Sequence, residues 1–287
     1  MDLTVCARTD AGLVRPVNED AFVVADLTSG CALHDPYAST RLEVGEQGVL
    51  LAVSDGLGGH AAGEVASALV LESLHRSLAR SIPPDPVQVD EVVEDAVLRA
   101  NRAVWEAGAL HRGRERMGAT LTAVFVHDGF AHIAEVGDSR AYLVRGRAIH
   151  LVTHDQSYLQ LLIDSGVSPW EARRSPLCGA VLQAMGLRPS VTVAIERLAL
   201  RQGDRLILCS DGLTSKVGDA ELRALVQWSR ETDMACEAMI DMALQRGGDD
   251  NVTAVVASLS GDLPPPVADE SISDTLQVVQ DFGMDVH

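Results

Sequence analysis

The chain is poor in basic residues and in aromatic residues. Its 287 residues include 23 Lys and Arg against 41 Asp and Glu, so the formal net charge at pH 7 is −18. A protein this acidic is repelled by nucleic-acid phosphates and by anionic lipid surfaces, so we expect neither nucleic acid nor a membrane as partner. Aromatic residues make up 3% of the chain and hydrophobic residues 47%. The sequence therefore predicts a globular protein with an aliphatic core.

Patterns typical of secreted, membrane-spanning or disulfide-bonded proteins are missing as well. Residues 1–6 show no basic segment followed by an apolar one, so we expect no signal peptide. No apolar run approaches the ~20 residues of a membrane span. The five cysteines are widely spaced, with no C-x-x-C pair. This argues against disulfide frameworks and zinc sites, and we expect a reducing, cytoplasmic location. A monomer is the separate expectation for the oligomeric state.

Acidic residues are concentrated in four turns that follow or flank apolar, strand-like runs. These turns contain Glu19-Asp20, Asp55, Asp211 and Asp249-Asp250. One Asp-Gly pair usually only forms a turn, but carboxylates that recur at strand ends are well placed to converge. Oxygen ligands suit hard divalent cations, and Arg15 beside them suits a phosphate. The pattern predicts metal-dependent phosphate chemistry.

The cysteines do not fit the alternative, covalent route to phosphate hydrolysis. A thiol phosphatase needs an arginine six positions after its cysteine, where this chain has Gly12, Tyr37, Ala184, Ser215 and Met242. A metal-activated water remains, and it requires a carboxylate that bridges two cations. Asp55 is the bridging candidate, because the glycines after it let the carbonyl of Gly56 approach a cation. Further carboxylates in similar or adjacent settings are Asp211, Asp250 and either Asp20 or Glu19.

Apolar periodicity predicts strands in two sets, each followed by paired helices. Strands are expected at 3–9, 21–25, 49–54, 120–126, 131–136, 141–144, 191–198, 205–209 and 252–259. Helices are expected at about 61–80, 89–104 and 155–165, with two more between 219 and 245. This order indicates an α+β fold of two stacked, mainly antiparallel sheets covered by helices. Residues 28–48 are expected to form an exposed loop and residues 168–186 an irregular excursion.

The composition changes after Gly261. Residues 262–287 contain three consecutive prolines and six acidic residues but no Lys or Arg. We expect a disordered tail. A short helix at about 275–282 that docks on a partner is the alternative.

Five sequence blocks occur in a specific order over about residues 3–259. They are Arg15-x-x-Asn18-Glu19-Asp20, Asp55-Gly56-x-Gly58-Gly59-His60, Gly137-Asp138-Ser139-Arg140, Ser210-Asp211-Gly212-Leu213 and Gly248-x-Asp250-Asn251-Val252-Thr253. Together they resemble the ordered motifs of the PPM (PP2C-type) protein Ser/Thr phosphatases in their bacterial form. The resemblance implies an αββα sandwich over residues 1–261, with a flap at about 166–186. It also implies two Mn²⁺ or Mg²⁺ ions in a cleft at one end of the sheets.

The same resemblance implies the roles of single residues. Asp55 bridges the cations, Gly56 contributes its carbonyl, and Asp211 and Asp250 complete the pair. Glu19 and Asp20 act directly or through waters, and Arg15 grips the phosphate. The expected catalytic residues are Arg15, Asp55 and Asp211. Asp138 matches the position of a third, weaker cation. The full set of expected metal ligands is Glu19, Asp20, Asp55, Gly56, Asp138, Asp211 and Asp250.

The chain departs from the family pattern at two places, and a third segment is one that varies within the family. Animal members have a histidine, thought to be a general acid, where this chain has Leu57, and His60 should not receive that role. The usual Asp-His-Ser segment appears here as His154-Asp155-Gln156-Ser157. The flap varies most within the family and carries substrate choice, so its sequence does not identify the substrate. Arg140 is expected to be a structural partner of a nearby carboxylate.

The resemblance implies an enzyme that hydrolyses phosphoSer and phosphoThr monoesters of proteins by direct attack of a metal-bridging water or hydroxide. Its substrate is then a phosphorylated protein, and its expected counterpart is a Ser/Thr kinase. Two other functions stay open at this stage. One is a phosphoprotein-binding regulatory module with weak catalysis on the same fold, and the other is a metallohydrolase for small phosphoesters.

Overall fold

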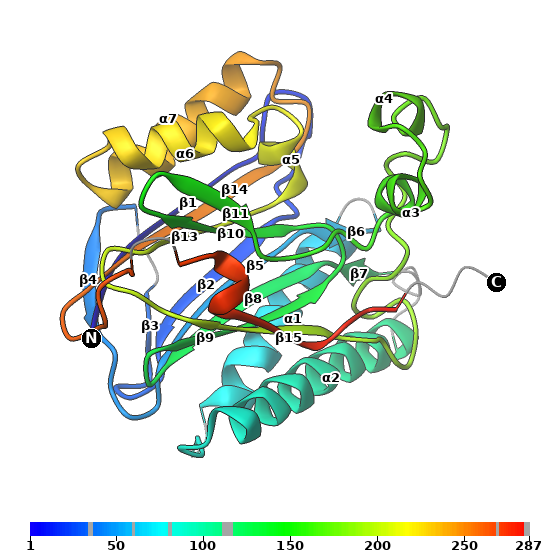
Figure 1. Cartoon of the computed structure of the whole chain (residues 1–287). Coiled ribbons are helices and arrows are strands. Elements are labelled where there is room, and N and C mark those ends of the chain that lie inside the picture. Colours follow the sequence, from blue (N-terminus) through cyan, green and yellow to red (C-terminus); the bar gives the residue numbers. More distant parts are fainter. Residues whose placement is uncertain (34–36, 59–60, 80–81, 111–116, 268–269, 284–287) are drawn as a thin grey trace.

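Two β-sheets lie face to face at the centre of the molecule (Figure 1). The computed structural model describes residues 1–33, 37–58, 61–79, 82–110, 117–267 and 270–283. The six-stranded sheet has the order β11 (Ala148–Leu151), β10 (Arg140–Arg145), β13 (Arg205–Cys209), β14 (Val252–Ser260), β1 (Asp2–Asp10) and β4 (Thr40–Glu43). The seven-stranded sheet has the order β15 (Leu276–Gln280), β12 (Ala194–Ala199), β9 (Phe130–Val136), β8 (Leu121–His127), β5 (Val49–Ser54), β2 (Ala21–Asp26) and β3 (Cys31–Ala32).

The neighbouring strands of both sheets pair antiparallel. Strands β6 (Gly56–Leu57) and β7 (Gly118–Ala119) form a separate short pair. Helices cover the outer faces of the sandwich, as Figure 1 shows. Apolar side chains of α1 (Ala61–Leu78) and α2 (Pro86–Leu110) pack on the seven-stranded sheet. Those of α5 (Asp211–Thr214), α6 (Asp219–Trp228) and α7 (Thr232–Gln245) pack on the other sheet. The predicted αββα sandwich is confirmed.

Strand β5 shows why its sequence is continuously apolar. All six of its residues are buried, because the strand is covered by the second sheet on one face and by helices on the other. Val49, Leu51 and Val53 pack between the sheets, whereas Leu50 and Ala52 pack under the helices, as the two-residue period of a strand requires. A run of this kind places its last residue at the end of the sandwich. There β5 passes directly into Asp55.

The loop expected at residues 28–48 contains two short strands. Strand β4 extends the six-stranded sheet by pairing with the start of β1, with Leu42 opposite Leu3. Leu42 also packs against the core between the sheets. The segment is largely exposed, as expected, but it is not only a loop, because its few apolar residues complete a sheet edge.

The tail differs from the prediction as well. Residues 272–274 form a short 3₁₀ helix, η1 (Ile272–Asp274), and β15 pairs antiparallel with β12. Glu270 lies 2.7 Å from the guanidinium of Arg201 and 3.4 Å from that of Arg145. Arg145 also donates a 2.8 Å hydrogen bond to the hydroxyl of Thr275. For the described part of the tail, disorder and the alternative helix were both wrong, because two arginines and an otherwise open sheet edge hold an extended strand.

A mainly irregular excursion separates β11 from β12. It holds α3 (Tyr158–Asp164) and α4 (Pro169–Ala172), which project from the sandwich beside β6 and β7 (Figure 1). The amide of Tyr158 donates to the carbonyl of Ala180, and Ser157 forms an isolated bridge with Val181. These contacts return the excursion to the end of the sandwich at which β5 stops.

Candidate metal and phosphate site

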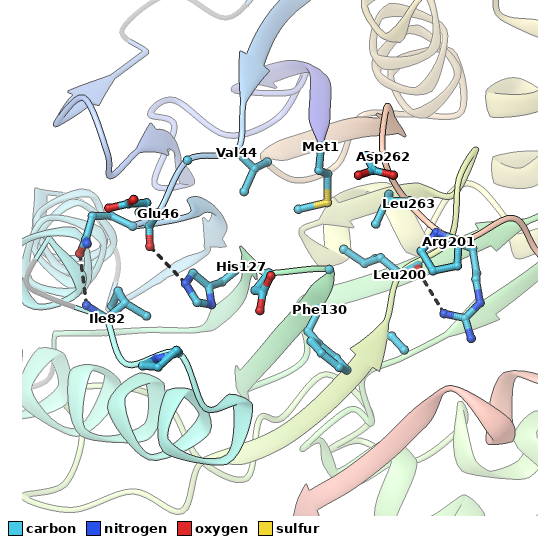
Figure 2. A pocket seen from close by; sticks show the side chains of 17 residues that line it. Met1, Val44, Glu46, Ile82, His127, Phe130, Leu200, Arg201, Asp262 and Leu263 are labelled. Atoms are coloured by element: carbon cyan, nitrogen blue, oxygen red, sulfur yellow. Dashed lines mark hydrogen bonds between the residues drawn. The ribbon is translucent and has the colours of Figure 1, made fainter.

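Among the cavities of the described residues, two lie at opposite ends of the sandwich. The cavity at the end of β5 has a volume of about 380 Å³ and is lined by expected site residues: Arg15, Glu19, Asp55, Gly56, Asp138, Asp211 and Asp250. The other, of about 880 Å³, is lined by Glu46, His127, Phe130 and Leu263 among others, and by none of the expected site residues (Figure 2). In it the ring of His127 bonds the backbone carbonyl of Glu46 (Figure 2). The smaller cavity is the candidate site.

Asp55 is fixed by its backbone. Its amide donates to the hydroxyl of Thr120 over 2.9 Å, and its carbonyl accepts from the amide of Thr120 over 2.8 Å. The hydroxyl of Ser54 donates to the Thr120 carbonyl over 2.6 Å. Because β8 begins one residue later, at Leu121, the carboxylate of Asp55 is anchored to two central strands. Sequence reasoning did not identify Thr120, which has no motif of its own.

Gly56 occupies a position that no other residue fits. A Cβ atom there would lie 2.3 Å from the carbonyl oxygen of Gly63 and 2.7 Å from that of Glu19. The amide of Gly56 also donates to the Glu19 carbonyl over 3.2 Å. The close approach of three backbone segments requires glycine, and it holds the Glu19 loop against α1.

Asn251 joins the loop of Arg15 and Glu19 to β14. Its side-chain oxygen accepts from the amide of Glu19 over 2.8 Å. Its side-chain nitrogen donates to the carbonyls of Ala11 and Val17 over 2.9 and 3.0 Å. Asn251 therefore organises the acidic and basic parts of the site at once. The sequence showed it only as a member of a block.

Asp20 lies behind the cavity wall rather than on it. One of its carboxylate oxygens accepts from the hydroxyls of Ser210 and Thr253, each over 2.7 Å. The other oxygen is buried and has no hydrogen-bond partner among the described residues. Burial raises the pKa of Asp20 to about 6. This carboxylate can hold β13 and β14 in place and add negative charge behind the cavity.

The carboxylates that line the cavity repel one another. Burial, followed by Asp20, Asp211 and Asp138, raises the pKa of Asp55 well above its usual range. Burial and then Asp211 raise the pKa of Asp138 to about 7. Burial and Asp250 raise the pKa of Asp211. Carboxylates held together against this repulsion are suited to bind cations, which would relieve it.

The donor set fits hard divalent cations. It consists of carboxylates and a close-packed backbone at Gly56, and one buried oxygen of Asp211 has no partner among the described residues. Asp250 is held by Arg15. Within the described residues no three Asp, Glu, His or Cys side chains are already arranged to hold a metal ion. Metal binding would therefore require side-chain movements in the cavity, including release of Asp250 from Arg15.

Arg15 stands at the mouth of the cavity. Its guanidinium lies 2.9 Å from a carboxylate oxygen of Asp250, with 54% of the Arg15 side chain exposed. An exposed guanidinium beside a cation site can bind the oxygens of a phosphate. The geometry therefore suits the role expected of Arg15.

Arg140 and Cys209 have no place in such chemistry. Arg140 forms a two-point ion pair with Asp155, over 2.7 and 2.6 Å, and also bonds Tyr142. This is the structural partnership predicted for Arg140. Burial raises the pKa of the Cys209 thiol to about 12, so no thiolate is available there. Leu57 lines the cavity, whereas His60 lies outside the described residues.

Comparison with known proteins agrees with this geometry. The family model described as protein phosphatase 2C matches residues 27–254. The chain belongs to this family. It is 35% identical to the serine/threonine protein phosphatase PstP of Mycobacterium tuberculosis over 90% of this chain and 45% of PstP, so it spans about half the length of that relative. It is 28% identical to the serine/threonine phosphatase stp of Listeria innocua, over 87% of this chain and 93% of that protein.

Solved structures of the family superpose on this phosphatase-family chain. The crystal structure of PstP has a TM-score of 0.76 and 34% identity, covering 91% of this chain and all of that one. The catalytic domain of PstP in complex with two manganese ions has a TM-score of 0.73 and 33% identity, covering 91% of this chain and 99% of that one. No helix in the described residues is long and apolar enough to span a membrane.

Proposed function

We propose that this chain is a metal-dependent protein Ser/Thr phosphatase that hydrolyses phosphoSer and phosphoThr monoesters. The observation that carries the proposal is the convergence of Asp55, Asp138, Asp211 and Asp250 with Arg15 around one cavity. Two divalent cations, Mn²⁺ or Mg²⁺, would supply the Lewis acidity that activates a water and neutralises phosphate oxygens. Membership of the protein phosphatase 2C family and the manganese complex of PstP support this assignment.

The residues divide the work of binding and orientation. Asp55 shares the cavity with Asp138, Asp211 and Asp250 and would bridge the cations, with the carbonyl of Gly56 beside it. Asp211 and Asp250 would complete the pair, and Glu19 and Asp20 would act directly or through waters. Arg15 would exchange its bond to Asp250 for one to the phosphate. Asp138, which also lines the cavity, would hold a third and weaker cation.

Membership of the family supports a phosphorylated protein as the substrate. Its phosphorylated side chain would enter a cavity bordered by Gly179 and Val181 of the flap. We place the enzyme in the cytoplasm as a monomer, acting on the products of a Ser/Thr kinase. The regulatory-module alternative is disfavoured because such modules commonly lack metal carboxylates, and none is missing here.

Turnover of a phosphopeptide and of a small aryl phosphate with Mn²⁺ tests the proposal, using the full chain and Asp211→Asn. The wild type should hydrolyse both substrates, and Asp211→Asn should hydrolyse neither. The control is Asp249→Asn, in the turn next to Asp250, which should keep wild-type rates. Binding of the phosphopeptide without turnover would favour the regulatory module. Turnover of the aryl phosphate alone would favour a small-molecule phosphoesterase.

A further inference from the structure

Gln156 is a fully buried amide that the proposed chemistry does not use. It stands in the His154–Ser157 segment, in which this chain departs from the usual Asp-His-Ser pattern. Its backbone and side chain bond to two different walls of the site cavity. One is the turn that carries Asp138, and the other is the flap.

On the first wall, Gln156 holds both polar groups of the Gly137 backbone. The amide of Gln156 donates to the Gly137 carbonyl over 2.7 Å, and the Gly137 amide donates to the side-chain oxygen of Gln156 over 2.8 Å. The side-chain nitrogen of Gln156 donates to the carbonyl of Glu135 over 3.2 Å. Gly137 itself adopts a φ of 117°, a conformation for which glycine is strongly preferred. Asp138 therefore leaves β9 in a direction that Gln156 sets.

On the second wall, Gln156 holds the flap. Its carbonyl accepts from the amide of Leu182 over 2.8 Å. Its side-chain oxygen accepts a second bond, over 2.8 Å, from the side-chain nitrogen of Gln183. Gln183 in turn bonds both backbone groups of Thr192, where the chain returns toward β12. Val181, between these contacts and the cavity, is a flap residue of the cavity lining.

Building on the proposed function, we infer that Gln156 and Gln183 are positioning residues that fix the flap relative to the Asp138 turn and so set the width of the substrate cleft. Only an amide side chain at position 156 can make the hydrogen bonds to both walls. It must accept from Gly137 and Gln183 through one atom and donate to Glu135 through another. A carboxylate cannot donate, and an apolar side chain would leave buried donors unpaired.

The two glutamines should affect the reaction in two separable ways. Loss of the Gln183 contact should release the flap and leave the Asp138 turn in place. Loss of the Gln156 side chain should release both. Because the substrate protein meets the flap while a small aryl phosphate meets mainly the carboxylates, the two substrates should report different losses.

The test uses the full chain, with Gln183→Ala, Gln183→Glu and Gln156→Ala compared with a control, Gln160→Ala. The Gln160 side chain bonds Asp164 on the exposed side of α3, away from both walls. Amide hydrogen exchange at Leu182 and Gly137 is measured first, without substrate. Gln183→Ala removes one hydrogen bond to Gln156 and two to Thr192, and it leaves the backbone bond from Leu182 to Gln156 in place. The flap that carries Leu182 should then open more readily, and a single lost hydrogen bond of about 1.4 kcal/mol corresponds to a tenfold change. In Gln183→Ala, Leu182 should therefore exchange at least about tenfold faster, while Gly137 keeps its protection.

In Gln156→Ala both amides should exchange faster. Gln183→Glu should behave like Gln183→Ala, because its carboxylate still accepts from Thr192 but cannot donate to Gln156. KM for the phosphopeptide should rise about tenfold in Gln183→Ala, with kcat for the aryl phosphate within twofold of wild type. In a double variant that carries Gln156→Ala and Gln183→Ala, the increase in Leu182 exchange should be smaller than the sum of the two single effects.

Unchanged exchange at Leu182 in Gln183→Ala and Gln156→Ala would overturn the inference, and so would an equal change in Gln160→Ala. Gln183 is only partly buried, so its variants keep the test decisive if Gln156→Ala does not fold. If neither the wild type nor any variant hydrolyses the phosphopeptide or the aryl phosphate, the proposed function fails. Hydrogen exchange would still decide whether the two glutamines hold the flap.

Discussion

Replacing Asp138 by Asn should stabilise the metal-free protein at alkaline pH. Burial, Asp211 and Asp155 raise the pKa of Asp138 from 3.8 to about 7. A carboxyl group with a raised folded pKa contributes its full stability below its unfolded pKa and loses that contribution as the pH rises through its folded pKa. The charged form of the buried Asp138 carboxylate therefore does not destabilise the wild type near pH 4 and destabilises it fully above about pH 7.

The size of the effect follows from the shift. About 3 pKa units at 1.36 kcal/mol each give a ceiling of about 4 kcal/mol. Asp138 keeps some solvent contact, and its acidic neighbours also take up protons, so we expect a gain of about 1–2 kcal/mol in the free energy of unfolding at pH 8.

The assay is urea unfolding in excess chelator at pH 5, 6.5 and 8, for wild type and Asp138→Asn. The two stabilities should converge toward pH 5 and separate at pH 8, with the variant more stable. Saturating Mn²⁺ should reduce or reverse the difference, since the wild type gains more from a bound cation. Lower stability of the variant at pH 8 without metal would refute the reasoning, because Asp138 would then be a structural carboxylate.

Three further predictions concern residues around this site and at the sheet edge. Arg15→Ala should raise KM more than it lowers kcat, and Arg15→Lys should rescue it poorly. Stability should change by less than about 0.5 kcal/mol, because the ion pair with Asp250 is exposed. An unchanged KM would show that Arg15 does not bind the phosphate. A chain ending at Gly261 lacks β15 and the Glu270 contacts and should lose about 2 kcal/mol of stability. A chain ending at Gly283 should match the full chain in thermal unfolding. Equal stability of all three would show that β15 and Glu270 contribute nothing to the stability of the fold. Burial raises the pKa of Glu196 from 4.5 to about 8, so the wild type should lose stability between about pH 4.5 and 8, by up to ~1.4 kcal/mol per pH unit. Glu196→Gln should not show this loss. Parallel pH profiles of the two proteins in denaturant titrations would contradict this.

The sequence predicted the layers and the acidic site because both depend on local patterns. Continuous apolar runs such as β5 identify strands buried on two faces, and they place Asp55 at a strand end. The tail was misread because its strand depends on distant partners, namely the open edge of β12 and the arginines Arg145 and Arg201. Prolines and acidic residues nearby also outnumber the few apolar residues of this strand.

The supporting residues of the site escaped prediction for a similar reason. Thr120 and Asn251 act through backbone groups that are far away in the sequence, so no spacing reveals them. Gln156 appeared only as a departure from a family segment. Side-chain bonds to distant backbone atoms depend on how the sheets and the flap are placed, which local periodicity does not encode.

The central claim is that this acidic cavity hydrolyses phosphoSer and phosphoThr by means of bound cations. The most direct measurement titrates metal-free protein with Mn²⁺ while bound ions and phosphopeptide turnover are recorded together, for wild type and Asp55→Asn. We predict no turnover in chelator, reversible recovery as two ions bind per chain, and neither high-affinity binding nor turnover in Asp55→Asn. Turnover that persists in excess chelator, or a wild-type rate in Asp55→Asn at limiting Mn²⁺, would contradict the account.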